Sequence, residues 1–163
     1  MKKLIRMIAC LIVAQFASGA WAGPKAWLGL EDDDKLRLQL SPFTMHRSYD
    51  EEHKEVIMVG LEREKLDGFN LFTNSFGQPS IYMYPWGGVW HQFGGVDALS
   101  FKWTAGLLYG YVAPYEDKVP LNHNGFSPAA IIALTYDIAP GWSGQVNVLG
   151  TAALMFQLNM DLK

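Results

Sequence analysis

After residue 22, the apolar residues of this chain lie in short segments, none of which reaches the roughly 20 residues of a membrane-spanning helix. Apolar residues are nevertheless abundant, because 50% of the chain is hydrophobic and 13% is aromatic. In the final segment, 154–162, every second residue is apolar, from Leu154 to Leu162. Apolar content spread over short alternating segments is typical of a transmembrane β-barrel and not of a helical membrane protein.

Turn signals divide the chain after residue 35 at intervals of roughly ten to fifteen residues, a spacing typical of all-β folds. The pattern predicts eight strands, over residues 36–49, 56–64, 69–75, 80–90, 99–114, 126–138, 145–149 and 154–162. Eight is the smallest number of strands that closes a membrane barrel, and closure is needed because lipid cannot satisfy a free sheet edge. We therefore expect an all-β fold, an eight-stranded antiparallel up-and-down transmembrane β-barrel over residues 36–163.

The first 22 residues have the layout of a signal peptide. Three basic residues lie within 1–6, an apolar stretch covers 7–16, and Ala20-Trp21-Ala22 fits a cleavage site. The apolar stretch is shorter than a membrane-spanning helix, which favours cleavage over an N-terminal anchor. We expect residues 1–22 to be removed on export, which leaves a short periplasmic or interfacial segment, 23–35, before the barrel.

The charge of the mature chain excludes one class of partner. The whole chain has 13 Lys and Arg against 16 Asp and Glu, and three of the basic residues and the single cysteine, Cys10, belong to the signal peptide. A mildly acidic chain without a basic run is unsuited to nucleic acid, so we expect no nucleic-acid partner. The histidine spacing gives no metal-binding motif, and we expect no metal and no other cofactor.

Alternation alone does not show which face of the strands meets lipid, because a soluble periplasmic barrel or sandwich alternates as well. Two features favour the outer membrane. Trp and Tyr lie near predicted strand ends, as in an aromatic girdle, and charges concentrate in the loops 50–55, 62–67 and 116–118. One feature opposes it, since the chain ends in Asp161-Leu162-Lys163 and not in the aromatic residue that ends many such barrels.

Two residues at predicted strand ends could carry chemistry together. In an up-and-down barrel the first and third strands both run outward, so His46 and Ser75 are predicted on the same extracellular rim. This placement allows an imidazole to reach a hydroxyl. The other histidines are weaker candidates: we expect His53 to be solvated in a charged loop, while His91 lies in an aromatic stretch and His123 in a polar loop.

Several short motifs carry a resemblance to a known family. The first strand ends in Thr44-Met45-His46, with Tyr49-Asp50 downstream, and Phe72-Thr73-Asn74-Ser75-Phe76 and Gln78-Pro79 follow the third strand. These segments resemble, in order, the T-x-H, Y-D, F-K-D-S-W and E-P motifs of the outer-membrane lipid A palmitoyltransferases called PagP. Val119-Pro120-Leu121 and the segments up to Phe156-Gln157 resemble that family's I-P-L loop and final strands, so the resemblance covers residues 36–160.

The resemblance implies an acyltransferase in the outer membrane. It would move a palmitoyl or similar chain from a phospholipid donor to lipid A of lipopolysaccharide, holding the chain inside a monomeric barrel. By position, the catalytic residues would be His46, Asn74 and Ser75, where Asn74 stands in place of the family's Asp. An amide supplies no negative charge but can orient a neighbour by hydrogen bonding. Asp50 or Glu52 in the nearby loop is an alternative carboxylate.

The expected chemistry needs a base, an oxyanion site and a path for the acyl chain. His46 would act as general base on Ser75 or on the acceptor hydroxyl, while rim N–H groups or the Asn74 amide would stabilise the oxyanion. Proline lacks the N–H that a strand ladder needs, so Pro42 and Pro128 are the preferred candidates for a lateral gap through which the donor chain enters. In the family, chain length depends on a residue at the barrel floor, which is either Tyr84 or Gly87 here.

Two non-enzymatic functions remain as alternatives for a small outer-membrane barrel. A narrow pore or small-solute transporter would need a polar lumen, although eight strands leave little room for a water-filled channel. A structural or adhesion protein would have no enzymatic phenotype and would tolerate replacement of His46 and Ser75.

Overall fold

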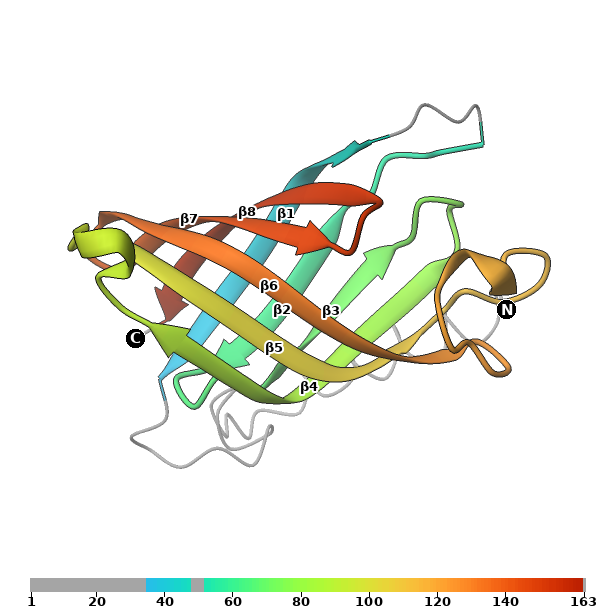
Figure 1. The fold of residues 1–163 in the computed structure, drawn as a ribbon, viewed down its shortest axis with the longest axis horizontal. Helices are drawn as coiled ribbons and strands as arrows, with labels where there is room; N and C mark the ends of the chain where they lie inside the picture. The colour runs from blue at the N-terminus through green and yellow to red at the C-terminus, as the bar shows by residue number, and fades with distance from the viewer. Residues whose placement is uncertain (1–34, 48–51, 163) are drawn as a thin grey trace, which may run out of the picture. The chain divides into compact units, whose positions relative to one another are not determined.

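Eight strands, each hydrogen-bonded to the next in sequence, close into an all-antiparallel barrel in the computed structural model of the chain (Figure 1). The structure describes residues 35–47 and 52–162, so the expected signal peptide and most of the segment 23–35 lie outside the described residues. The strands are β1 (Leu36–His46), β2 (Met58–Arg63), β3 (Gly68–Thr73), β4 (Pro79–Trp90), β5 (Leu99–Tyr109), β6 (Phe126–Ala139), β7 (Trp142–Leu149) and β8 (Ala153–Leu162). The predicted fold class is confirmed, and each predicted strand has a counterpart.

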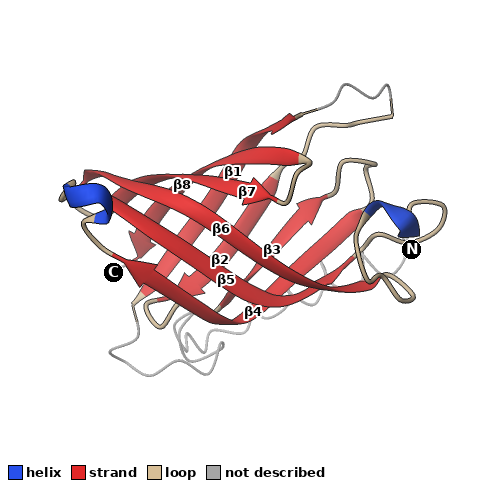
Figure 2. Ribbon diagram, viewed as in Figure 1, coloured by secondary structure: helices blue, strands red, loops and turns tan. Residues whose placement is uncertain are grey.

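Helical structure is confined to two short 3-10 turns in the described part of the chain, η1 (Phe93–Gly95) and η2 (Glu116–Lys118) (Figure 2). No helix within residues 35–47 and 52–162 is long and apolar enough to cross a bilayer.

Several strand ends differ from the sequence-based prediction. β3 ends at Thr73 and not at Ser75, because the chain turns back at Asn74, whose N–H donates to the Gln78 carbonyl over 2.9 Å. β5 ends before Gly110, whose φ of +137° is a conformation that favours glycine. Ser75 therefore lies in a turn, where the alternation of a β-strand does not determine the direction of its side chain.

The two rims of the barrel carry different connections. One rim, here called the long-loop rim, carries the connections after β1, β3, β5 and β7, of which the structure describes residues 47, 52–57, 74–78, 110–125 and 150–152. The other, the short-turn rim, carries residues 64–67, 91–98 and 140–141 together with the start of β1 and the end of β8. Outer-membrane barrels have this asymmetry, with the longer loops outside the cell.

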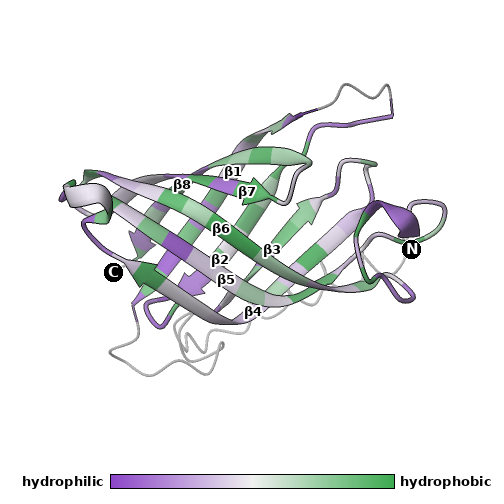
Figure 3. Cartoon of the chain, in the orientation of Figure 1, coloured by the Kyte–Doolittle hydropathy of each residue, from purple (hydrophilic) through white to green (hydrophobic). Residues whose placement is uncertain are grey.

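The strands present an apolar face outward and a largely polar face to the lumen, and the two kinds of residue alternate along them (Figure 3). Large exposed apolar side chains include Leu40, Phe43, Val59, Leu71, Met83, Trp103, Leu107, Ile132, Leu134, Phe156 and Leu158. Buried polar side chains include Gln39, Ser41, Glu62, Lys102, Gln145, Asn147, Gln157 and Asn159. A water-soluble barrel requires the reverse arrangement, so this one is compatible with an outer-membrane protein.

A hydrogen-bonded network around Glu62 fills the lumen toward the short-turn rim. The Glu62 carboxylate accepts bonds from Gln39 Nε2 at 3.1 Å and from the Tyr84 hydroxyl at 3.0 Å, and it pairs with the Lys102 ammonium. All four side chains are buried. A buried charge is stable only when it is paired and hydrogen-bonded, so these contacts hold β1, β2, β4 and β5 around one point.

A second network runs along the facing side of the lumen. Asn147 on β7 accepts a bond from Gln145 Nε2 at 2.6 Å and donates to Gln157 Oε1 on β8 at 2.9 Å. Asn159 Nδ2 donates to Ser143 Oγ at 3.2 Å. Because amides carry both donors and acceptors, they satisfy one another without water.

The buried ion pair allows a stability prediction. Lys102→Met leaves Glu62 charged, with only the more distant Arg37 at 4.0 Å as a cation, so we expect the free energy of unfolding in detergent, from urea titration of tryptophan fluorescence, to fall by about 3 kcal/mol. The double variant Glu62→Gln, Lys102→Met should recover most of this loss. As a control, breaking the exposed Lys35–Glu64 pair with Lys35→Met should cost at most about 1 kcal/mol. Equal losses for the two single variants would contradict the assigned role of the buried pair.

Candidate active site

His46 and Ser75 meet at the long-loop rim. His46 is the last residue of β1, Ser75 lies in the turn after β3, and His46 Nε2 is 2.7 Å from Ser75 Oγ. The prediction that both residues lie on one rim is confirmed, and the two side chains are in hydrogen-bond contact. A neutral imidazole at this distance can accept the hydroxyl proton, which is the arrangement of an activated serine nucleophile.

The inward direction of His46 depends on an irregularity in β1. Leu40 pairs with Leu158 and Phe43 pairs with Phe156, so β1 has one residue more than β8 between these two pairs. Beyond this bulge the ladder continues regularly to His46, which pairs with Ala153.

Asn74 is fully buried and builds the turn that carries Ser75. Its Oδ1 accepts bonds from the N–H groups of Phe76 and Gln78, each over 3.0 Å. Its amide donates to Gln78 Oε1 and to the Gly110 carbonyl, each over 3.2 Å. Both amide hydrogens are therefore used within the protein, and the geometry supports a positioning role for Asn74 over the donation of a hydrogen bond to an oxyanion.

Two further loops hold Ser75 from either side. The N–H of Lys54, in the loop after β1, donates to the Ser75 carbonyl over 2.7 Å. The hydroxyls of Tyr111 and Ser75 share a hydrogen bond. Burial raises the pKa of Tyr111 above its ordinary value, while the bond to Ser75 acts in the opposite direction, and so Tyr111 stays a neutral phenol at neutral pH. Sequence reasoning missed Tyr111, because nothing local relates it to Ser75.

The prediction of a solvated His53 is wrong. His53 is half-buried, and its ring centroid lies 4.3 Å from that of His46 with the planes tilted by 30°. It also meets the Phe76 ring edge-on at 5.5 Å. The charged residues around His53 in sequence gave no sign of this contact, which joins residues before β2 to the end of β1.

Two other histidine candidates have different surroundings. His91 lies at the short-turn rim, where its Nδ1 is 3.2 Å from Ser100 Oγ, and His123 is exposed in the loop after β5. Asp50 lies outside the described residues, and Glu52 is exposed. Within the part of the chain that the structure describes, no three His, Cys, Asp or Glu side chains group closely enough to hold a metal ion.

A cavity of about 490 Å³ extends from His46 and Ser75 into the lumen, a volume in the range of small-molecule sites. Near the rim it is lined by His46, Ser75, Tyr111 and Lys118, and then by the apolar side chains of Met58, Phe72, Leu108 and Met155. The cavity ends against Gln39, Glu62, Tyr84 and Lys102 of the network around Glu62. Its lining is thus polar at the rim, apolar in the middle and strongly polar at the far end.

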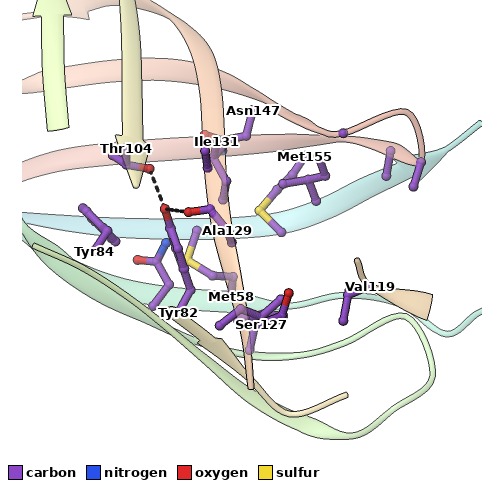
Figure 4. A pocket seen from close by; sticks show the side chains of 18 of the residues that line it. Met58, Tyr82, Tyr84, Thr104, Val119, Ser127, Ala129, Ile131, Asn147 and Met155 are labelled. Atoms are coloured by element: carbon purple, nitrogen blue, oxygen red, sulfur yellow. Dashed lines mark hydrogen bonds between the residues drawn. The ribbon is translucent and has the colours of Figure 1, made fainter. Parts of the chain in front are cut away.

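The close view shows Tyr82 and Tyr84 among the side chains that line this cavity (Figure 4). The Tyr82 hydroxyl is 3.2 Å from Thr104 Oγ1 and donates to the Ala129 carbonyl. Of the two floor candidates, Tyr84 lines the cavity. A Cβ on Gly87 would instead lie 2.5 Å from the Leu66 carbonyl, at a turn of the short-turn rim. Tyr84 is therefore the floor candidate that lies at the polar end of the cavity, together with Gln39, Glu62 and Lys102.

Strand pairing is interrupted at two places next to the long-loop rim. β1 pairs with β2 only as far as Ser41 and Met58, and Pro42 follows at once. β6 pairs with β7 only from Ile132 onward, so 126–131, which includes Pro128, pairs with β5 alone. In Figure 1, β6 continues past the end of the β7–β8 hairpin. Pro42 thus directly follows the end of the β1–β2 pairing, and Pro128 lies in the part of β6 that does not pair with β7.

Comparison with known proteins adds no relative: no protein-family model matches the chain, and no curated protein matches it.

Replacing Asn74 tests its role. Asn74→Asp installs the carboxylate of the PagP motif, but it removes the two hydrogens that Asn74 donates to Gln78 and Gly110. We expect unfolding free energy at pH 7 to fall by about 1–3 kcal/mol, with partial recovery at acid pH, where a protonated carboxyl can donate again. Urea unfolding in detergent at pH 4.5 and 7 measures this. An unchanged stability would show that the four contacts of Asn74 do not hold the turn.

Proposed function

We propose that this protein is an outer-membrane acyltransferase that moves a palmitoyl or similar acyl chain from a phospholipid to lipid A. The observation that carries the proposal is the His46–Ser75 pair, 2.7 Å apart at the mouth of the lumen cavity. An acyl chain placed among the apolar side chains of the cavity would bring its ester carbonyl to the rim, beside Ser75. The resemblance of the motifs around His46, Asn74 and Ser75 to those of PagP supports the same reaction.

The proposed reaction uses His46 as a base and then as an acid. His46 Nε2 accepts the Ser75 proton while Ser75 Oγ attacks the carbonyl carbon of the donor ester. The bond between that carbon and the glycerol oxygen breaks, and His46 returns the proton to the leaving oxygen, which releases a lysophospholipid. A lipid A hydroxyl then gives its proton to His46 and attacks the acyl-Ser75 ester, and the regenerated Ser75 oxygen takes the proton back.

The outside of the barrel supports access from the membrane. The outward face is apolar, and both interruptions in strand pairing lie beside the rim that carries His46 and Ser75. An unpaired strand edge lets a lipid chain pass between strands without breaking a ladder hydrogen bond. The gap beside Pro42 and the gap beside Pro128 would therefore admit the donor and release the product.

The lumen argues against a pore. Glu62, Gln39, Tyr84 and Lys102 bond to one another across one side of the lumen, and the amides from β7 and β8 occupy the other side. Eight-stranded barrels have interiors that side chains can fill, and here they do so below the cavity.

Lipid A mass spectrometry tests the proposal. The protein is expressed in a Gram-negative host that lacks palmitoylated lipid A, and we expect a lipid A mass gain of one acyl chain. His46→Ala and Ser75→Ala should each reduce the gain at least about 100-fold, because a positioned base and its nucleophile act as one unit.

The matched controls are His91→Ala and Ser100→Ala, which break a second His–Ser contact at the opposite rim and should leave the mass gain unchanged. No gain from correctly folded wild-type barrel would refute the proposal. A gain that survives both His46→Ala and Ser75→Ala would refute the site.

Tyr84 gives a prediction about product length. Tyr84→Gly removes the side chain at the end of the cavity, so we expect the variant to transfer longer acyl chains than the wild-type protein. The acyl-length profile of the lipid A product measures this, with Tyr136→Gly, at an exposed position of β6 outside the cavity, as the control. An identical profile for Tyr84→Gly and wild type would show that Tyr84 does not set the depth.

A further inference from the structure

His53 has three properties that the reaction described above does not use. Its ring packs against that of His46, with centroids 4.3 Å apart and planes tilted by 30°, and it meets Phe76 edge-on at 5.5 Å. Its Nδ1 atom is buried and has no hydrogen-bond partner among the described residues. Buried polar atoms without a partner are rare in proteins, and they need an explanation in terms of function or of bound water.

The loop that carries His53 is fixed to the turn that carries Ser75. The neighbouring Lys54 N–H donates to the Ser75 carbonyl over 2.7 Å. Phe76, on the far side of His53, stacks on Tyr115 with centroids 4.2 Å apart and planes within 15°. His53 is thus held between His46 and a rigid aromatic group, and it cannot move without disturbing the surroundings of Ser75.

We propose that His53 is a positioning residue that holds the His46 ring against Ser75 and opposes protonation of His46, an inference that rests on the proposed acyl transfer. Ring stacking restricts rotation of the His46 imidazole, so Nε2 stays directed at Ser75 Oγ. In many serine enzymes a carboxylate orients the base. Here Asn74 stands at the position of the Asp in the PagP motif, and its side-chain hydrogen bonds go to Phe76, Gln78 and Gly110 and not to His46.

The stack also has an electrostatic consequence. Two imidazolium charges a little over 4 Å apart repel, so a proton on one ring opposes a proton on the other. Among the described residues, the other charged and titratable groups of this rim are Arg47, Glu52, Lys54 and Glu55 in the same loop, and Tyr111, Tyr115, Glu116, Asp117, Lys118 and His123 in the loop after β5. Among them Lys118 adds a further positive charge, 5.5 Å from the Phe76 centroid. Neutral His46, the form that can act as a base, should therefore persist to lower pH than it would without His53.

Two variants at position 53 separate the packing of the ring from its charge. His53→Ala removes the ring, and we expect kcat for acyl transfer in detergent micelles to fall roughly 100-fold, the effect of misplacing a reacting group, with KM for the phospholipid unchanged. His53→Phe keeps a ring that can stack and should restore most of kcat. In that variant the acid limb of the pH–rate profile should move to higher pH by about one unit, because the repelling charge is gone.

His123→Ala, an exposed histidine of the same rim, is the matched control and should change neither kcat nor the pH profile. Heat-modifiable migration on gels checks that each variant forms a barrel. If His53→Ala does not fold, the pH profile of His53→Phe still decides the electrostatic role. Unchanged kcat in His53→Ala, or an unmoved acid limb in His53→Phe, would overturn the inference.

Nitrogen-15 NMR of the histidine rings provides a readout that needs no acyl transfer. In micelles, the titration midpoint of His46, assigned with a His46→Gln variant, should rise in His53→Phe and stay unchanged in His123→Ala. A raised midpoint in a protein that transfers no acyl chain would refute the proposed function and leave the His46–His53 contact established. An unmoved midpoint in an active protein would refute the contribution of His53 alone.

Discussion

Closure of the sheet between β1 and β8 is the constraint on which the rest of the structure depends. The first and last strands pair from Leu36 and Leu162 at one end to His46 and Ala153 at the other. In lipid, every backbone N–H and carbonyl group needs an internal partner, and only a closed barrel provides one without a free edge. Closure also encloses the lumen, and the polar residues on its inner face are then forced to satisfy one another.

The side chains inside the barrel differ between its two ends. Toward the short-turn rim, Glu62 and Lys102 neutralise each other while amides from β7 and β8 exchange hydrogen bonds. Toward the long-loop rim the lining becomes apolar, and a cavity remains open up to His46 and Ser75. The half of the lumen near the short-turn rim is thus filled by side chains that hydrogen-bond to one another, while the half near the long-loop rim contains the cavity. The hydrogen-bonded networks and the cavity therefore lie toward opposite ends of the same strands.

The strands were predictable from sequence, whereas much of the site was not. Period-two alternation and turn residues are local signals, so eight strands and the rim position of His46 followed from them. The contacts of Asn74 with Gly110 and of Tyr111 with Ser75 join different loops, and no local pattern encodes them. His53 shows the limit most clearly. Its charged neighbours in sequence predicted a solvent-exposed side chain. In the structure its ring instead packs against His46, at the end of β1, and Phe76, in the turn after β3.

The extra residue in β1 determines which side of the wall the base occupies. Before the bulge, Gln39 and Ser41 are buried in the lumen and Leu40 faces outward. Uninterrupted alternation would continue this parity and turn His46 toward the outer face of the barrel with Leu40. The added residue inverts the parity, so Phe43 and Met45 are exposed and His46 faces inward. A change of one residue in strand length at Ser41-Pro42 therefore separates a barrel with an imidazole at the mouth of its lumen from an otherwise identical barrel that carries this imidazole on its outer face.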